Sequence, residues 1–545
     1  MELPSSLDIP PPAQSPPPFS SSSSSSDALL LPLIPPPSPD DEVEVVPVAK
    51  QVSSWSLVGQ IGALSWPVVV AYLLEMMVPV VSLTVLGHVG TDVLGGAALA
   101  TMFANVTGVS TCFGLATALD TLASQAVGAG RENAVGLQAQ RGAAILLLTA
   151  ALVTGSLWLN AGPILVALHQ DPHVAHIAQT YIRCLIPMLP ALCILEVQKK
   201  VAYALQVVRP QLVILLVVNS INAGLQVAAV HGLGLHYLAV PILTSASAWV
   251  SVAIFGAYMA RDPVFARVWT GWHLRAAFQQ WPSFLRLGLP GLLMLTMEWW
   301  AFELLALEAG LLGTEALAAQ VIVLNIASLL FMIPLGQSVA VSTLVGNFLG
   351  AGNPRTAKRC AFLALACVCG TAMCTALLLI LTRSHLALAY TSDPVIIRLV
   401  SRALIVVAVF QIFDGVQAVC SGTLRGVGRQ SLGAVGNFFG YILIGVPLGA
   451  LLAFKADASV EGLWIGMTLG LFLTSSTYTI VLSLQNWPHY SRLAVSRAHA
   501  QTIITHPDSD STNIDADIDA DIDTNTNIDT NTDNPLISLL SDFDP

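Results

Sequence analysis

Twelve apolar segments, each close to the length of about 20 residues that a helix needs to cross a lipid bilayer, limit this chain to one class of fold. The chain is 54% hydrophobic and only 10% charged. The alternating segments of about 10 residues that build a membrane barrel do not occur in the sequence. We therefore expect an all-α polytopic membrane protein. Its twelve transmembrane helices are predicted near 57–86, 94–118, 140–160, 175–197, 209–230, 238–259, 283–309, 316–341, 359–382, 400–423, 431–454 and 460–484.

An internal repeat divides these segments into two sets of six. The matches are Pro67 on Pro290 and Glu75 on Glu298 at an offset of 223, residues 114–130 on 336–352 at 222, and Gln198 on Gln417 at 219. Because six is an even number, both copies have the same orientation in the membrane. We expect two parallel six-helix lobes with a cavity between them.

The polar ends and the repeat together predict the domain organisation. Residues 508–545 hold eleven Asp and no Lys or Arg, and the first 50 residues are rich in Pro and Ser. The predicted parts are a disordered cytoplasmic tail at 1–50, an N-terminal lobe at 51–260, a cytoplasmic inter-lobe linker at 261–282, a C-terminal lobe at 283–487 and an acidic disordered cytoplasmic tail at 488–545.

The distribution of basic residues predicts the orientation. With a cytoplasmic N-terminus, the inner loops and tails carry 17 of the 22 lysine and arginine residues, so the positive-inside rule places both termini in the cytoplasm. The N-terminus lacks the basic and small-residue pattern of a signal peptide, and we expect the first span to act as its own insertion signal. A multi-pass protein of the plasma membrane is the predicted location.

Common enzymatic and ATP-binding motifs are missing from the sequence. None of the five lysines stands in GxxxxGK[ST], and neither HExxH nor GxSxG occurs. The eight cysteines lie in apolar segments without CxxC spacing, so we expect them to be reduced. We predict no enzyme activity, no cofactor, no metal site and no nucleic-acid partner, and any transport must draw on an ion gradient.

Acidic residues within the apolar segments are the candidates for chemistry, because a charge in the bilayer is costly unless it has a function or a partner. Glu298 and Glu303 lie in the seventh segment, Asp414 in the tenth and Glu75 in the first. Glu298 and Glu303 differ by about 140° around a helix, so both should not face one narrow cavity. Asp414 has Glu298 as its predicted partner, the alternative being a structural bond to a neighbouring glutamine.

Three further acids have simpler interpretations. Asp120 is predicted to be solvated or to cap a helix, Glu196 to pair with Lys199 or Lys200 at the membrane boundary, and Glu308 to be solvated. Trp299, beside Glu298, either packs or contacts an organic cation through its ring.

Several stretches resemble the multidrug and toxin extrusion (MATE) family, and within it the animal organic cation/proton antiporters. They are NVTGVSTCFGLATALDTLASQ at 105–125, QDPHVAHIAQTYI at 170–182, the stretch 269–303 that contains EWWAFE, VSTLVGNFLGAGNP at 341–354 and SGTLRGVGRQ at 421–430. The resemblance covers about residues 55–490. It implies a two-lobed fold and export of organic cations in exchange for protons.

The resemblance also implies site residues. The family's acids carry over to Glu298, Glu303 and Asp414, and its asparagine in the second span to Asn105. Where relatives have an acid in the eighth span this chain has Asn325, and where some have a histidine before the acid of the tenth span it has Gln411. The family's animal members carry an extra C-terminal helix that is not expected here.

The function predicted from all this is a MATE-type secondary transporter that extrudes organic cations and xenobiotics against protons by alternating access. The alternatives are a sodium-coupled antiporter, a lipid-linked flippase, which would want a wide basic cavity, and a receptor that does not transport. The expected partners are small organic cations, protons and the lipid bilayer, and the protein is expected to be a monomer.

Overall fold

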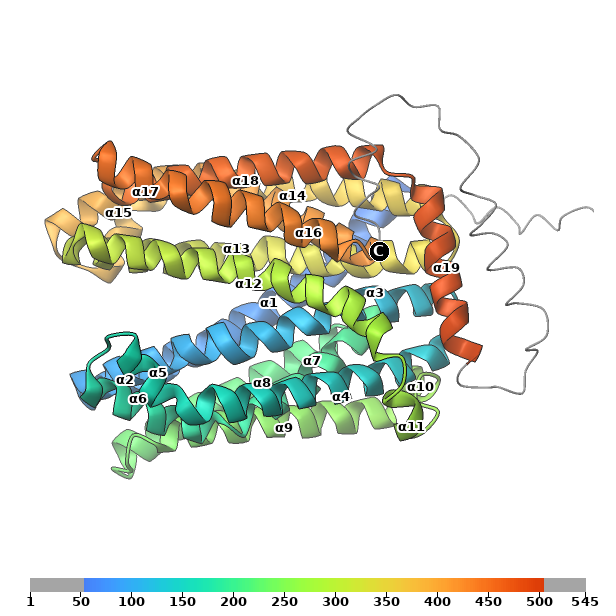
Figure 1. The fold of residues 1–545 in the computed structure, drawn as a ribbon, viewed down its shortest axis with the longest axis horizontal. Coiled ribbons are helices and arrows are strands. Elements are labelled where there is room, and N and C mark those ends of the chain that lie inside the picture. The colour runs from blue at the N-terminus through green and yellow to red at the C-terminus, as the bar shows by residue number, and fades with distance from the viewer. Residues whose placement is uncertain (1–52, 504–545) are drawn as a thin grey trace, which may run out of the picture. The chain divides into compact units, whose positions relative to one another are not determined.

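Helices make up the regular structure of residues 53–503, the part of the chain that the computed structural model describes (Figure 1). The predicted tail at 1–50 and the acidic residues from 508 lie outside the described residues. The first copy of the repeat contains α1 (Ser54–Gly87), α2 (Thr91–Ala104), α3 (Ser110–Gly128), α4 (Glu132–Ser156), α5 (Ala161–Ala167), α6 (Pro172–Leu185), α7 (Met188–Ala204), α8 (Arg209–Val227) and α9 (Ala239–Arg261). A π segment at Asn105–Val109 joins α2 to α3.

The second copy follows two short helices, α10 (Pro263–Ala266) and α11 (Leu274–Ala277). It contains α12 (Trp281–Leu312), α13 (Thr314–Gly350), α14 (Pro354–Tyr390), α15 (Pro394–Val427), α16 (Gln430–Asn437), α17 (Val446–Lys455) and α18 (Ser459–Leu484). Asp-Pro pairs begin α6, α10 and α15, and in each the aspartate accepts hydrogen bonds from the first turn while proline takes a position that needs no N–H.

The all-helical membrane fold predicted from the sequence is confirmed. Within residues 53–503, ten helical runs are long and apolar enough to cross a membrane, and the bent pair α6 and α7 makes an eleventh. The remaining predicted span corresponds to α12, which is 32 residues long but carries three glutamates. The count of twelve therefore rests on α12, and two of its glutamates, Glu298 and Glu303, line the site described below.

Residues 487–503 form a helix, α19 (Trp487–Ile503), which corrects the prediction of a disordered tail from residue 488. It lies across the ends of α3, α4, α13 and α14 (Figure 1). Trp487, Tyr490, Ala494 and Ala498 are buried, and their spacing of three or four residues forms one apolar stripe among polar residues. The overall polarity of the segment conceals this stripe in a search for membrane spans.

The two copies meet through equivalent glycines of the repeat. A Cβ atom added at Gly128 of α3 would collide with the carbonyl of Asn347 in α13, and one added at Gly350 would collide with the carbonyl of Gln125. An offset of 222 relates both pairs, so the same contact is made twice in reciprocal form. Only glycine allows so close an approach. The lobe boundaries given above stay predictions.

Candidate functional site

A cavity of about 590 Å³ lies between helices of the two copies and collects most of the predicted site residues. Seven of them line it: Glu75, Asn105, Glu298, Trp299, Glu303, Gln411 and Asp414. The walls come mainly from α1, α3, α7, α12, α13 and α15. A cavity of this size is in the range of small-molecule sites in proteins.

Asp414 lies on a face of α15 that points into this cavity. Gln411, Asp414, Gln417, Ser421 and Arg425 line the cavity at intervals of three or four residues, as expected for one side of a helix. Asp414 is 2% exposed, and its Oδ1 has no hydrogen-bond partner among the described residues. A buried carboxylate oxygen without a partner is costly, so Asp414 is suited to hold a proton or to receive a ligand.

Glu298 of α12 is also buried and lines the same cavity, near Asp414 and the guanidinium of Arg425. A polar network holds its helix in place: Gln417 donates to Asn437 Oδ1 at 3.0 Å, and Asn437 donates to the carbonyl of Met294 at 2.8 Å. The hydroxyl of Tyr478 donates to the same Asn437 oxygen at 2.8 Å. These bonds fix α12 against α15, α16 and α18, and they set the position of the Glu298 carboxylate.

Glu303 and Glu298 both line the cavity, although the angle of about 140° between them was expected to keep both from facing one narrow cavity squarely. The cavity follows α12 from Gly291 to Glu303 and is wide enough to include more than one helix face. Trp299 packs edge to face on Phe113 of α3, with ring centroids 6.3 Å apart. Trp299 therefore packs against Phe113 and also forms part of the cavity wall, and its contact with a cation stays a prediction.

Asn325 does not belong to the site. It is exposed on α13 and donates to the carbonyl of Val321 in its own helix at 2.9 Å, while its neighbours Leu324 and Ala327 line the cavity. The prediction was wrong because the resemblance gave the position in the sequence but not the helix face.

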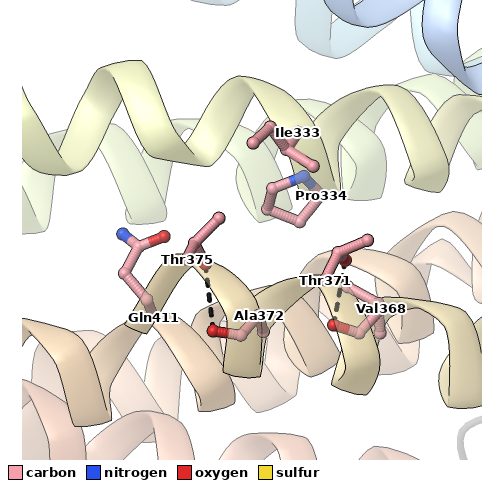
Figure 2. Close-up of a pocket in the computed structure, with 7 residues that line it drawn as sticks. All are labelled: Ile333, Pro334, Val368, Thr371, Ala372, Thr375 and Gln411. Carbon is pink, nitrogen blue, oxygen red and sulfur yellow. Dashed lines mark hydrogen bonds between the residues drawn. The ribbon is translucent and has the colours of Figure 1, made fainter. Parts of the chain in front are cut away.

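Gln411 lines both the main cavity and a small pocket beside Pro334 (Figure 2). Its amide donates to the carbonyl of Ala327 at 3.4 Å. In the pocket, the hydroxyls of Thr371 and Thr375 donate to carbonyls of their own helix. Gln411 thereby ties α15 to α13 close to Asp414.

Glu75, in contrast, has a cationic partner that the sequence did not reveal. The ammonium of Lys199 in α7 lies 3.0 Å from Glu75 Oε1 and also pairs with Glu196. The pairing predicted for Glu196 is therefore present. Lys199, however, does not lie at the membrane boundary as expected: its side chain is 1% exposed and lines the cavity. The separation of 124 positions between Glu75 and Lys199 explains why no local pattern indicates this contact.

Asp120 forms a second buried charge cluster, not the solvated cap that was expected. Its carboxylate lies 2.8 Å from Lys200 Nζ and 3.3 Å from Arg425 Nε. Arg425 also donates to Ser338 Oγ at 2.9 Å, and Gln125 donates to the carbonyl of Gly426 at 3.0 Å. Asp120 and Arg425 belong to different copies of the repeat, so this cluster joins the copies where α3 meets α15.

Comparison with known proteins also finds two copies in this chain. The MatE family matches residues 67–228 and again residues 290–451, two ranges whose starts are 223 residues apart. The chain belongs to the MatE family. It is therefore a transmembrane transporter and not an enzyme.

Animal relatives and a solved structure of a eukaryotic transporter agree with this family. Multidrug and toxin extrusion protein 2 of Mus musculus is 35% identical over 436 residues, which cover 80% of this chain and 76% of the relative. Multidrug and toxin extrusion protein 1 of Danio rerio is 36% identical and covers 82% and 75%. The eukaryotic MATE transporter AtDTX14 superposes with a TM-score of 0.77 at 29% identity, covering 82% of this chain and 99% of that one.

Proposed function

We propose that this MATE transporter is a secondary active antiporter that exports organic cations in exchange for protons. The observation that carries the proposal is the pair Glu298 and Asp414, two buried carboxylates in one cavity, neither of which forms an ion pair among residues 53–503. The names of the animal relatives, which describe multidrug and toxin extrusion, support the substrate class.

The coupling follows from charge. Two carboxylates close together in a medium of low dielectric repel each other, so loss of the first proton is easier than loss of the second. The singly deprotonated pair carries one negative charge, which suits one organic cation. Proton binding from the acidic side removes that charge and releases the cation. Phe113, Trp299 and Phe302 line the same cavity and offer ring faces to the cation.

Alternating access would open this cavity to one side of the membrane at a time. The contacts of Asp120 with Arg425 and of Gln125 with Gly426 lie at the ends of α3 and α15, next to basic loops that we assign to the cytoplasm. With both termini on that side, these contacts would close the cytoplasmic entrance. The plasma membrane remains the proposed location, since export from the cell requires it.

The test is uptake of a fluorescent organic cation into proteoliposomes with an acidic interior and no sodium. Rapid uptake that collapses when the pH gradient is removed, and that is missing in Glu298→Gln, is the expected result. Uptake that needs a sodium gradient and ignores the pH gradient would replace proton coupling by sodium coupling. Asn325, the amide that could have favoured sodium, is not among the residues that line the cavity.

A further inference from the structure

The ammonium of Lys199 lies in a cage that has the composition of a cation-binding site. Two carboxylates, from Glu75 and Glu196, pair with it. Its Nζ also lies 5.6 Å from the ring centroid of Tyr72 and 5.3 Å from that of Phe113. Carboxylates combined with aromatic rings at these distances are the groups that recognise alkylammonium ions.

The cage opens onto the transport cavity, since Tyr72, Glu75, Phe113 and Glu196 all line it. With Lys199 in place the cage carries a net charge of one minus, and without the ammonium it would carry two. Two neighbouring carboxylates, one buried and one partly buried, would be unfavourable without a cation. The lysine therefore takes the place that a free cation would otherwise occupy.

The repeat shows what the second copy has in place of this lysine. The offset of 223 relates Glu75 to Glu298, and the offset of 219 that relates Gln198 to Gln417 relates Lys199 to Ala418. Ala418 also lines the cavity. In the second copy a methyl group therefore stands where the first copy has an ammonium, and the carboxylate equivalent to Glu75 stays open to the cavity.

We propose that Tyr72, Glu75, Phe113 and Glu196 form a second cation site whose resident ligand is the Lys199 ammonium, and that Lys199 thereby restricts the cavity to substrates with one positive charge. The consequence for substrate choice rests on the function proposed above, but the occupancy of the cage does not. The ligand class of the emptied cage is a small primary alkylammonium.

Chemical complementation tests the occupancy without any transport. Lys199→Ala removes three methylenes and the ammonium, and n-propylammonium supplies the same atoms. We expect millimolar n-propylammonium to raise the melting temperature of purified Lys199→Ala by about 2 °C or more, through preferential binding to the folded state. The unmodified protein, whose cage is filled, should not respond, and n-propanol, which lacks the charge, should stabilise neither. Equal responses of both proteins to n-propylammonium would overturn the proposal.

A second set of variants tests whether Lys199 restricts the charge of the substrate. It also provides a test if Lys199→Ala does not fold. Lys199→Met keeps the side-chain length without the charge. Its affinity for a dication with one quaternary and one primary ammonium end, relative to tetraethylammonium, should rise about tenfold, the effect of one added charge interaction of moderate strength. Lys199→Arg should keep the original ratio, and Lys199→Met with Glu75→Gln should restore it, because the net charge of the cage returns to one minus.

Lys358→Met is the matched control, because Lys358 is exposed and donates only to the carbonyl of Ser483 at 3.4 Å in the described structure. An unchanged ratio in a folded Lys199→Met that still binds tetraethylammonium would contradict the proposed restriction. Failure of the unmodified protein to bind tetraethylammonium would count against the proposed function instead, and it would leave the result with n-propylammonium unaffected.

Discussion

Glu75 and Glu298 occupy equivalent positions in the two copies of the repeat, but their surroundings differ. Glu75 pairs with Lys199, whereas Glu298 forms no ion pair in the described structure and lies near a second carboxylate, Asp414, and near the guanidinium of Arg425. The same offset that places Ala418 on Lys199 places Asp414 on Leu195. One copy has thus gained a fixed cation and the other a second acid. The position of a carboxylate in the fold does not by itself make it available for transport. Whether it is available depends on whether a neighbouring side chain, such as Lys199, supplies a cation.

Removal of the open carboxylate is expected to have the largest effect. Glu298→Gln keeps volume and hydrogen bonding but cannot carry a proton, so pH-driven exchange in proteoliposomes should fall to the level of empty liposomes. Glu75→Gln is the matched control from the other copy. It leaves Lys199 paired with Glu196, and it should retain most of the exchange. Equal loss in both variants would show that the two copies contribute alike.

Asp414→Asn should resemble Glu298→Gln, because the two acids are proposed to act as one unit. Under that proposal the double variant is no worse than either single one, since residues in contact show non-additive effects. Residual exchange in either single variant that disappears only in the double variant would assign the two carboxylates separate roles.

A lysine introduced into the second copy should make it resemble the first. In Ala418→Lys the new ammonium can reach the cavity and neutralise Glu298 or Asp414, so cation uptake should fall at least tenfold, the effect of about 1.4 kcal/mol of lost attraction. Ala418→Met has similar bulk and no charge, and it should lose much less. The ratio of uptake between these two variants is the measurement. A ratio near one would mean that crowding, and not charge, closes the site.

Cation affinity should depend on pH through the protonation of Glu298 and Asp414, and not through Glu75, which is paired with Lys199. As pH falls, the pair takes up protons and its negative charge disappears, so binding of a permanently charged cation should weaken by up to about tenfold per pH unit for one proton. Binding to detergent-solubilised protein is measured over about pH 5 to 9, a range around neutrality. Asp414→Asn should flatten this dependence and Glu75→Gln should not. Constant affinity in the unmodified protein would remove the shared-site mechanism.

The fold and the positions of Glu298 and Asp414 were predictable because both depend on sequence features that are energetically unfavourable outside one structural context. Apolar length and repeat offsets indicate the helices, and the cost of acids in apolar segments indicates Glu298 and Asp414. The partner of Glu75 was not predictable, because the contact with Lys199 exists only once α1 and α7 are packed. Asn325 failed for a related reason, since a position in a sequence does not fix which helix face meets a cavity. α19 was missed because its stripe of four buried residues is too narrow to count as apolar.

Truncation at the C-terminus is expected to have the smallest effect and to separate α19 from the residues after it. Deletion of 504–545 removes a segment of mostly Asp, Asn and Thr, with too little apolar surface to pack against helices. Exchange per molecule in reconstituted protein should stay within about twofold of that of the unmodified protein, the range of a surface change.

Deletion from residue 487 also removes α19, whose Trp487 and Tyr490 are buried and whose His499 Nδ1 lies 3.1 Å from the Arg131 guanidinium of the first copy. That larger deletion should lower the melting temperature, because it exposes the ends of α3 and α13 that α19 covers. A strong loss of turnover from the shorter deletion alone would show that the acidic segment takes part in the transport cycle, and it would add a third region to the comparison of the two copies.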